Sequence, residues 1–548
     1  MNKGGYLILD CYVDEPACLG VPPFIAPYPR YLYGALLDAG IPGDLITYLT
    51  IDALRESDFL LRETYRAVFL IGGAVVPGKY LGYRIGTLTE IRTITSRNSG
   101  QMFYIGGLIS HVMKEERNVL PVLNDIEQYA FTLAKGAPED TRRTYGDLAR
   151  WAVRGAQAVR YHPDYPELIC EMETYRGCPR LTRCSFCSES LKEGTSFREQ
   201  SHILDEIDAL TACGITRFRL GSQPDILQYR SALTDYKNGF PRPSPGEVAK
   251  LFSSLKSKVA SGAVTLLNID NANPGTIVNF PEESSEILAA IADAVTPGDT
   301  MSLGVESFDP AVIARNNLKV TAEELITAVG IINQAGGGRV DGIPVLLPGI
   351  NLIHGLPGEN ADTFRTNYEV LKDILNRGLL LKRINIRKLQ PFPGTGTWGT
   401  KPSMKGTVRN RFEYYRGKIR DEIDHVMLQK IYPVGTVLRD LRIEDTRYEY
   451  SYGKQLGSYA ITTVLPLVLP KKEFTDAVVT GHRERSLNAL PVPVMINDLP
   501  LKALASIPGV GKGLGENIII ARPLRDISEL EAIATSLHEK IKAHCALR

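Results

Sequence analysis

Several features that would assign a chain to a membrane or to a highly charged partner are missing from this sequence. No run of about 18 apolar residues occurs, so nothing is expected to span a bilayer. Lys and Arg total 63 and Asp and Glu total 62, and the net charge of +1 gives no general attraction to nucleic acid or anionic membrane. The first residues, MNKGGYLILD, pass directly into a strand-like run with no signal peptide. We therefore expect a cytoplasmic protein.

Cysteine is also scarce, with eight in 548 residues, yet one short segment holds three of them. That segment reads RGCPRLTRCSFC and contains Cys178, Cys184 and Cys187, with gaps of five and then two residues. Such crowding favours metal chemistry in a reducing compartment over a disulfide framework. Three thiolates can ligate three irons of a [4Fe–4S] cluster and leave the fourth iron open to a small ligand.

Two other interpretations of these cysteines remain open. With Cys170 added, four sulfurs are available for a zinc site, although zinc sites usually show two close pairs. The cysteines are otherwise explained as core or disulfide residues that need no metal. Cys170 lies in the apolar run LIC, and we expect it to pack as a small hydrophobic residue. The same expectation applies to Cys11, Cys18, Cys213 and Cys545.

The length predicts about three or four domains. Runs of apolar residues and turn residues predict a mainly α/β chain with these parts: a Rossmann-like domain over 1–150, a partial barrel over 165–395, a linking helix over 400–430, a small β module over 433–495, and a helical hairpin over 498–548.

The first domain alternates strands and helices. Strands are expected at 5–11, 45–49, 67–72 and 102–106, and a helix at 28–39. This order predicts a parallel, doubly wound sheet that binds ligands beyond the carboxyl ends of its strands. The pairs Gly72-Gly73 and Gly106-Gly107 lie there, and glycine lets a backbone approach a flat ligand closely.

The second region repeats strand and helix six times. Strands are expected at 168–173, 216–221, 264–269, 301–306, 343–348 (extending to 355) and 382–389; helices are expected at 199–212, 246–260, 284–294, 321–335 and 362–377. The repeat predicts an open (β/α)6 barrel with its chemistry at the carboxyl ends of the strands. Polar residues follow these ends: Gln223, Asn271, Asn273, Glu306 and His354. Ordinary loop polarity explains any single one, but their shared location indicates a site.

The cysteine loop and the barrel pattern resemble the radical SAM superfamily, whose hallmark is three cysteines after the first barrel strand. This chain's first gap is two residues longer than the superfamily pattern. The resemblance implies that S-adenosylmethionine (SAM) chelates the open iron and is cleaved by one electron, from a donor such as ferredoxin, to a 5′-deoxyadenosyl radical. It implies that Glu306 contacts the amino acid portion of SAM and that Asn271 and Asn273 lie near its ribose. It also implies that Phe186 and the LIHGLPGE run with His354 lie beside the adenine. Gln223 is expected to be a further SAM-binding residue.

The first domain resembles the cobalamin-binding domain of one radical SAM class, particularly in GVPPFIAPYPRYLYGALLDAG. The resemblance implies cobalamin near the two glycine pairs. The Asp-x-His-x-x-Gly signature that supplies a histidine to cobalt is missing, as it is from many members of that class. The alternative is a Rossmann-like domain without a cofactor.

The tail carries two further resemblances. Residues 433–495, with GKQLGSYA, resemble the TRAM domain, an OB-like module of RNA-modifying enzymes. Pro508–Gly513, read PGVGKG, resembles the helix-hairpin-helix of DNA-binding proteins, whose backbone N–H groups bind phosphate beside a charge such as Lys512. The alternative is a hairpin for protein contact. In 401–430, eight Lys or Arg face four Asp or Glu, a pattern typical of a solvated helix face.

The whole arrangement resembles an archaeal radical SAM family named for its helix-hairpin-helix end. It implies cobalamin-dependent C-methylation of a protein residue; related enzymes methylate a glutamine of methyl-coenzyme M reductase. The alternative is a tRNA-modifying, methylthiotransferase-like enzyme, although only Cys11 and Cys18 are available for its second cluster. A third hypothesis is a nucleic-acid-binding protein whose cluster senses redox state.

Overall fold

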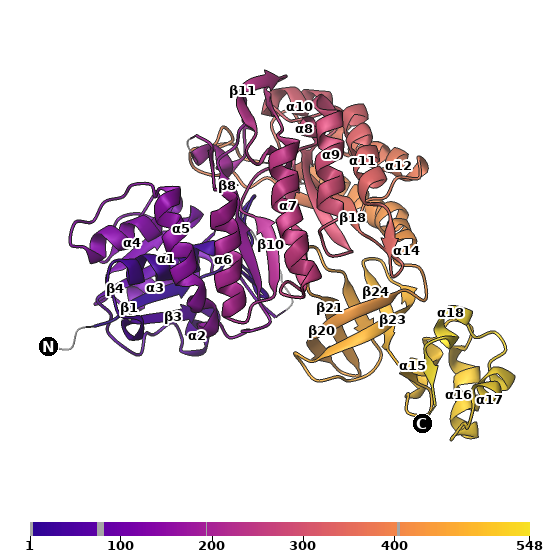
Figure 1. The fold of residues 1–548 in the computed structure, drawn as a ribbon. Helices are drawn as coiled ribbons and strands as arrows, with labels where there is room; N and C mark the ends of the chain where they lie inside the picture. The colour runs from indigo at the N-terminus through magenta and orange to yellow at the C-terminus, as the bar shows by residue number, and fades with distance from the viewer. Residues whose placement is uncertain (1–3, 74–81, 193, 403–405, 548) are drawn as a thin grey trace. The chain divides into compact units, whose positions relative to one another are not determined.

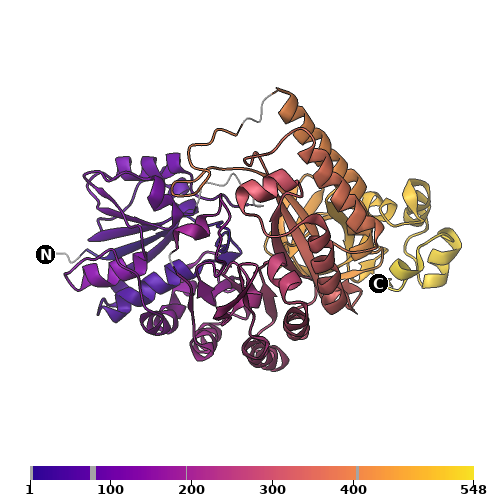
Figure 2. The same ribbon diagram turned by 90° about the horizontal axis from the view of Figure 1, so that it is seen from above.

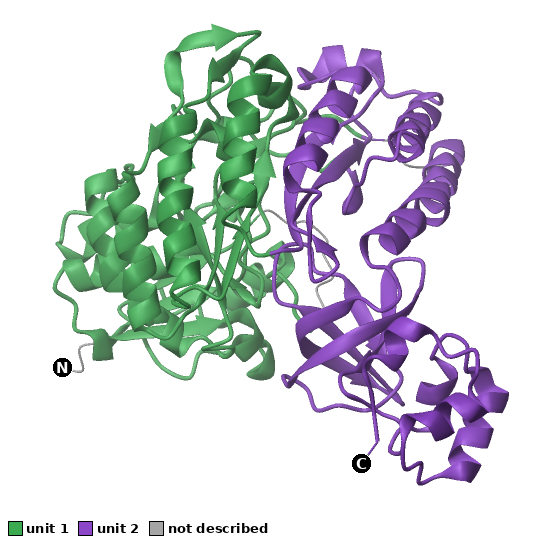
Figure 3. Cartoon of the chain, turned by 45° about the vertical axis from the view of Figure 1, so that its right-hand side comes forward, with its two compact units in different colours: residues 1–296, 389–401 green, residues 297–388, 402–548 purple. Residues whose placement is uncertain are grey.

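The structure is a computed structural model that describes residues 4–73, 82–192, 194–402 and 406–547. The chain forms two compact units, residues 1–296 with 389–401 and residues 297–388 with 402–548 (Figure 3). The predicted barrel region is thus divided, with its first three strands in unit 1 and its last three in unit 2. Of the helices in the described part of the chain, none combines the length and apolar character needed to cross a membrane.

The N-terminal sheet of unit 1 is parallel and doubly wound, as predicted. Its strands are β1 (Tyr6–Asp10), β3 (Ile46–Thr50), β4 (Ala67–Ile71), β5 (Phe103–Gly106) and β6 (Val119–Pro121), in the order β3-β1-β4-β5-β6. Alternate residues of β1 point to opposite faces: Tyr6 and Ile8 enter one core, and Leu7 and Leu9 enter another. Figure 2 shows helices on both sides of this sheet.

Each face of the N-terminal sheet has its own pair of helices. α1 (Pro27–Asp38) and α4 (Ile126–Ala134) pack on one face, and α2 (Ile51–Glu56) and α3 (Leu88–Arg97) pack on the other. α5 (Tyr145–Arg154) and the 3-10 helix η3 (Gly155–Tyr161) follow and approach α1 backbone to backbone. A Cβ built on Gly34 would lie 1.9 Å from the Trp151 carbonyl oxygen, so glycine is what permits this approach.

A second parallel sheet in unit 1 carries the strand that precedes the cysteines. Its order is β13 (Leu266–Ile269), β10 (Arg217–Gly221), β7 (Ile169–Glu173) and β2 (Phe24–Ile25), and it is covered by α6 (Gln200–Ala212) and α7 (Pro245–Ala260) (Figure 1). Strands β7, β10 and β13 match the predicted ones. The pairing of β2 was not predicted, because a two-residue strand inside a proline-rich segment leaves no periodic pattern.

Short elements of unit 1 frame the loops of this second sheet. They are β8 (Tyr175–Arg176) paired with β9 (Ser196–Phe197), the 3-10 helices η4 (Ser188–Leu191) and η5 (Ile226–Gln228), the hairpin of β11 (Ala232–Lys237) and β12 (Phe240–Arg242), and the helices α8 (Pro274–Asn279) and α9 (Pro281–Ala292).

Unit 2 begins with the last three strands of the predicted barrel. β15 (Asp299–Glu306), β18 (Leu346–His354) and β19 (Arg383–Lys388) are parallel in this order, with helices α10 (Pro310–Asn316), α11 (Ala322–Gly336) and α12 (Thr363–Asn376) between them. The predicted linking helix is interrupted: α13 (Gly406–Ile419) passes through a π-helical turn, η6 (Arg420–Asp424), into α14 (His425–Ile431). Sequence periodicity does not distinguish such a turn from a continuous helix.

The small β module is a closed five-stranded barrel, which confirms the predicted module. Its order is β20 (Val437–Arg447), β21 (Tyr450–Gln455), β22 (Thr462–Leu465), β24 (Ser486–Pro491) and β23 (Phe474–His482). β22 and β24 run parallel, and the β20-β21, β20-β23, β21-β22 and β23-β24 pairs are antiparallel. Five strands closed in this way agree with an OB-like barrel.

The C-terminal segment contains the predicted helical hairpin and a second one. α15 (Leu501–Ala505) and α16 (Gly511–Ala521) form the first, and α17 (Ile527–Ile533) and α18 (Glu539–Lys542) form the second. Gly509, at φ 87°, lies against the second hairpin, because a Cβ there would be 1.6 Å from the Ser536 carbonyl oxygen. The hairpins share a hydrophobic core with Val478 and Leu490 of the barrel.

Candidate functional site

The cysteine segment forms a loop directly after β7 and β8. Cys178 and Cys187 are half-buried and Cys184 is buried, and the Cys187 N–H donates to the Cys184 carbonyl oxygen at 3.3 Å. Burial first, and then the neighbouring Cys184 and Cys178 thiols, raise the pKa of Cys187. All three predicted sulfurs are thus close enough in the loop to act on one another electrostatically.

The arrangement of donors separates the cluster interpretation from the zinc interpretation. Among the described residues, no three His, Cys, Asp or Glu side chains converge on a single metal ion. A mononuclear zinc site requires that convergence, whereas a [4Fe–4S] cluster takes each cysteine on a different iron. Cys170 is fully buried on β7, where desolvation raises its pKa to about 12, so it packs as a core residue. The loop therefore suits a cluster better than zinc.

A small pocket of about 200 Å³ lies beside the cysteine loop in unit 1. Its lining brings Cys178 together with Asn273, and includes Arg180, Asp225 and Phe240. Asn273 begins α8 and its Oδ1 accepts a hydrogen bond from the Gly275 N–H at 3.1 Å. Asn273, the strand-three residue predicted for SAM, therefore lines the same pocket as Cys178, and its role toward SAM stays a prediction.

The other predicted polar residues of unit 1 make internal contacts. Gln223 is buried; its Nε2 donates to the Leu220 carbonyl oxygen and its Oε1 accepts from Thr174 Oγ1, both at 3.1 Å. Asn271 Nδ2 donates to the Pro16 carbonyl oxygen at 2.6 Å, and Phe186 is half-buried between two cysteines. These contacts hold the loops in place, and the role of all three toward SAM stays a prediction.

Glu306, in unit 2, has unused binding capacity. It ends β15 at φ 72°, a backbone region that non-glycine residues rarely adopt, and its Oε2 is buried without a hydrogen-bond partner. Desolvation raises its pKa to about 7, against the opposing influence of Lys319 and Arg387. A buried carboxylate with an unsatisfied oxygen suits an ammonium ligand, such as the α-amino group of SAM.

His354 is, by contrast, already engaged. Its Nδ1 lies 2.9 Å from Glu359 Oε2, and its ring stacks on Phe364 with the ring centroids 4.5 Å apart. It is buried at the end of β18, in the position that the sequence predicted. These partners fix the imidazole orientation, and its contact with adenine stays a prediction.

A larger cleft, of about 790 Å³ when space open to solvent is counted, lies at the carboxyl edge of the N-terminal sheet. One wall comes from the ends of β4 and β5 through Ile71 and Gly107, and from the start of α4 through Asp125 and Ile126. The facing wall is the segment after the cysteines, with Ser188, Leu191 and Lys192. The cleft therefore lies where the fold predicts a ligand and within reach of the cysteine loop.

The four predicted glycines lie at this edge, mainly for reasons of packing. A Cβ built on Gly107 would lie 2.5 Å from the Gly72 carbonyl oxygen, and one built on Gly106 would lie 2.5 Å from Ile126 Cβ. A Cβ built on Gly73 would lie 2.9 Å from Val13 Cα. The Gly72 N–H donates to the Gly106 carbonyl oxygen at 3.1 Å. Gly107, at φ 79°, is the member of the set that lines the cleft.

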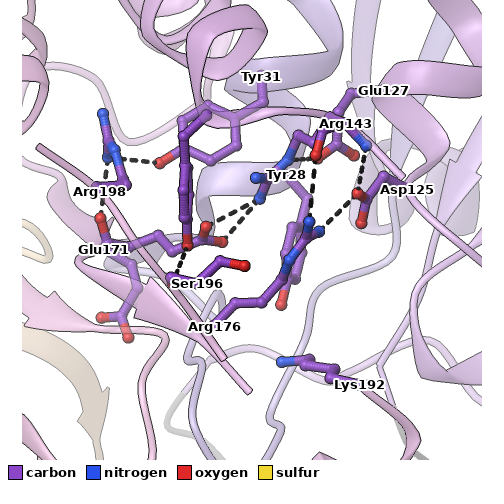
Figure 4. Close-up of polar contacts among 12 residues, drawn as sticks. Tyr28, Tyr31, Asp125, Glu127, Arg143, Glu171, Arg176, Lys192, Ser196 and Arg198 are labelled. Atoms are coloured by element: carbon purple, nitrogen blue, oxygen red, sulfur yellow. Dashed lines mark hydrogen bonds and ion pairs between the residues drawn. The ribbon is translucent and has the colours of Figure 1, made fainter. Parts of the chain in front are cut away.

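An ion network among residues that line the cleft is drawn in Figure 4. Arg143 donates through Nε to Glu127 Oε1 at 2.5 Å, and through Nη2 to both carboxylate oxygens of Glu173 at 3.0 and 2.8 Å. Arg176, two residues before Cys178, donates to Asp125 Oδ2 at 2.6 Å. Although burial opposes it, the adjacent Arg143 and Arg176 guanidinium groups keep the pKa of Glu173 below its ordinary value. The network connects the cysteine loop to the N-terminal sheet.

Two lining residues retain unsatisfied polar atoms. Glu15 Oε1 and Arg143 Nη1 are buried and have no hydrogen-bond partner, while Tyr28 donates to Glu15 Oε2 at 3.2 Å. These two residues of the cleft lining therefore have capacity for one further hydrogen bond each, Glu15 as acceptor and Arg143 as donor. Sequence reasoning missed Glu15, Arg143 and Lys192, because their partners are distant in the chain and no motif surrounds them.

Comparisons with known proteins point in the same direction. The family described as the Radical SAM superfamily matches residues 172–371. An uncharacterized protein of Methanocaldococcus jannaschii is 41% identical over 520 residues, which cover 89% of this chain and 93% of that protein. An uncharacterized protein of Archaeoglobus fulgidus is 38% identical over 532 residues, covering 96% and 97%.

Two solved structures share a weak likeness to the fold. One is the radical SAM methyltransferase TsrM from Kitasatospora setae with cobalamin and a [4Fe–4S] cluster bound, at TM-score 0.46 and 15% identity over 72% of this chain and 77% of that chain. The other is the cobalamin-dependent SAM radical enzyme OxsB, at TM-score 0.44 and 12% identity over 77% and 56%.

Proposed function

The chain belongs to the radical SAM superfamily, and we propose that this enzyme uses cobalamin to methylate a carbon atom of a protein residue. One observation carries the cobalamin assignment. The cleft of about 790 Å³ lies between the carboxyl edge of a doubly wound sheet and the segment that follows the cluster cysteines. A cofactor held there would lie beside Ser188, Leu191 and Lys192, which directly follow the cysteines in the chain.

The residues of the cysteine loop fit the cluster and SAM. Cys178, Cys184 and Cys187 supply three thiolates, and the loop offers no fourth cysteine, so one iron stays open. Asn273 lines a pocket with Cys178 and is the polar group of unit 1 that suits the nucleoside portion. Glu306 of unit 2, taken by itself, keeps an unsatisfied carboxylate oxygen that suits an ammonium group.

The cleft fits a cofactor whose rim carries amide groups, as a corrin does. The unsatisfied Glu15 Oε1 accepts a hydrogen bond from an amide N–H, and the unsatisfied Arg143 Nη1 donates to an amide oxygen. Gly107 presents bare backbone to the same space. When bound, the cluster and cobalamin would supply one-electron cleavage of SAM and a transferable methyl group. The protein binds and orients them and excludes water.

Cobalamin binding is tested directly on anaerobically reconstituted protein. We expect hydroxocobalamin to be retained after desalting, and Glu15→Gln to weaken binding about tenfold, because a buried acceptor is lost. Glu56→Gln, an exposed residue of α2, is the matched control and should bind normally. Protein that cleaves SAM to 5′-deoxyadenosine but retains no cobalamin would refute the cobalamin assignment and leave the radical SAM assignment intact.

The protein-residue target follows from the resemblance in the sequence. Mass analysis of candidate protein substrates after reaction, including the glutamine-bearing region of methyl-coenzyme M reductase, tests it. A mass increase of one methyl group on a carbon supports the target, and SAM consumption without any modified protein counts against it.

The C-terminal hairpin supports the alternative of a nucleic-acid substrate. Gly511, at φ 64°, borders open space, and the Lys512 side chain is 78% exposed, with Glu516 3.9 Å away. Phosphate contacts of this kind are sensitive to salt. RNA that copurifies at moderate salt, and is lost in Lys512→Glu, would favour this substrate class over protein.

A further inference from the structure

The first gap of the cysteine loop is anchored to a neighbouring β-hairpin. This gap, residues 179–183, is the part that exceeds the superfamily pattern in length. The Leu181 N–H donates to the Gly239 carbonyl oxygen at 3.0 Å, in the turn between β11 and β12. The hairpin lies in the same unit as all three cysteines. The longer gap therefore has a defined position rather than forming a loose loop.

Arg180 uses this anchor to turn back toward a cysteine. Its Nη1 donates to Cys184 Sγ at 3.2 Å, and its guanidinium carbon lies 4.8 Å from the centroid of the Phe240 ring. Phe240 is itself fixed: it is 3% exposed, and a Cβ on Gly275 would lie 2.2 Å from its Cζ. The fixed Phe240 ring thus holds the Arg180 guanidinium in hydrogen-bonding contact with Cys184 Sγ.

We infer that Arg180 is a positioning residue that raises the reduction potential of the [4Fe–4S] cluster. Reduction adds one negative charge to the cluster, and hydrogen bonds to the cysteine sulfurs and nearby charge are among the factors that set its potential. A guanidinium that donates to Cys184 Sγ stabilises the reduced form more than the oxidised form. This inference rests on the cluster assigned above and is independent of cobalamin.

The test is an EPR-monitored redox titration of reconstituted full-length protein, with iron and sulfide content measured on each sample. In Arg180→Met, which lacks both charge and donor, we expect the ratio of reduced to oxidised cluster at a fixed potential to fall about tenfold, equivalent to about 59 mV. Arg180→Lys keeps the charge and should lose less. Arg242→Met removes a charge from the same hairpin, where Arg242 pairs with Asp235 and Glu283, and should match the wild type.

The outcomes are distinguishable. An unchanged potential in Arg180→Met with full cluster content overturns the inference, as does an equal shift in Arg242→Met. If Arg180→Met assembles no cluster, Phe240→Leu serves as the second test. This variant keeps the Arg180 guanidinium but removes the aromatic ring against which it packs. An unchanged reduction potential in Phe240→Leu counts equally against the inference. Wild-type protein that assembles no [4Fe–4S] cluster would overturn the proposed function itself.

Discussion

Replacing Arg143 by methionine should destabilise unit 1 strongly and in a pH-dependent way. Its guanidinium is 2% exposed and neutralises the buried Glu127 and Glu173. Removing one partner of a buried ion pair typically costs about 3–5 kcal/mol, because the remaining charge is left uncompensated. Since whole domains are stable by only about 5–15 kcal/mol, the variant should lose a large fraction of its stability.

The sign of the pH dependence follows from the two carboxylates. In the wild type, the pKa of Glu173 is lowered, so its contribution is present at neutral pH and is lost as pH falls through that pKa. Without Arg143, Glu173 keeps only Arg176 and Arg198 against burial, and Glu127 loses the cation beside it, so both pKa values should rise above their wild-type values. The stability deficit of the variant should therefore be largest near pH 8 and shrink toward pH 5.

Tryptophan fluorescence provides a selective assay for this prediction. The chain has two tryptophans, both in unit 1: Trp151 is fully buried on α5, and Trp398 is 60% exposed. Urea unfolding followed by Trp151 emission thus reports the region around Arg143. Arg150→Met is the control: Arg150 lies on α5, the helix that carries Trp151, and its side chain is 51% exposed. This substitution should lower the free energy of unfolding by about 0–1 kcal/mol. A deficit for Arg143→Met no larger than the control, or one independent of pH, would refute the reasoning.

Three further predictions concern single positions. Gly34→Ala should cost about 1–3 kcal/mol or more in the same urea titration, because its Cβ meets the Trp151 carbonyl oxygen at 1.9 Å. Gly246→Ala, in open space on α7 of the same unit, should be neutral or stabilising there. Glu306→Gln should stabilise the ligand-free protein at pH 8 by on the order of 3 kcal/mol, and should not stabilise it at pH 4.5. The reason is that burial raises the pKa of Glu306 to about 7, so its ionisation costs folding stability as pH rises from 4.5 to 7. Calorimetry at both pH values checks this. The same variant should lose the thermal stabilisation that SAM gives the wild type. Cys184→Ser should abolish the cluster's EPR signal while leaving the circular dichroism spectrum unchanged, and a retained signal would remove Cys184 from the ligand set.

The sequence predicted the strands and helices of both parallel sheets because apolar runs and helical periods are local signals. Residues 6–10, 46–50 and 67–71 are strands in the structure within a residue or two of the prediction. The prediction that Cys178, Cys184 and Cys187 are cluster ligands rests on the same kind of signal, because their spacing is a local pattern. The π-helical turn at Arg420–Asp424 and the pairing of Phe24–Ile25 with β7 were not, because tertiary contacts decide them.

The predicted site was only partly visible in the sequence. Strand-end residues such as Asn273 and Glu306 follow from topology, but whether a polar atom stays unsatisfied depends on neighbours far along the chain. Gln223 and Glu306 look alike as strand-end residues, yet Gln223 is satisfied by Thr174 and Leu220, while Glu306 keeps an oxygen without a partner. Arg143 and Glu173 are 30 residues apart, so no motif joins them.

The two-residue strand Phe24–Ile25 makes the first domain a structural part of the catalytic sheet. It completes the edge of β7, and the next helix sends Arg30 to Glu206 of α6. Deleting the first domain would expose the hydrogen-bonding edge of the strand that leads to the cysteines. It would also remove Arg30 from Glu206 and leave the ion pair between Glu206 and Arg198. Domain swaps between related enzymes that cut before β7 should therefore yield insoluble barrels, whereas a graft that carries residues 24–30 along with the barrel would keep that edge closed.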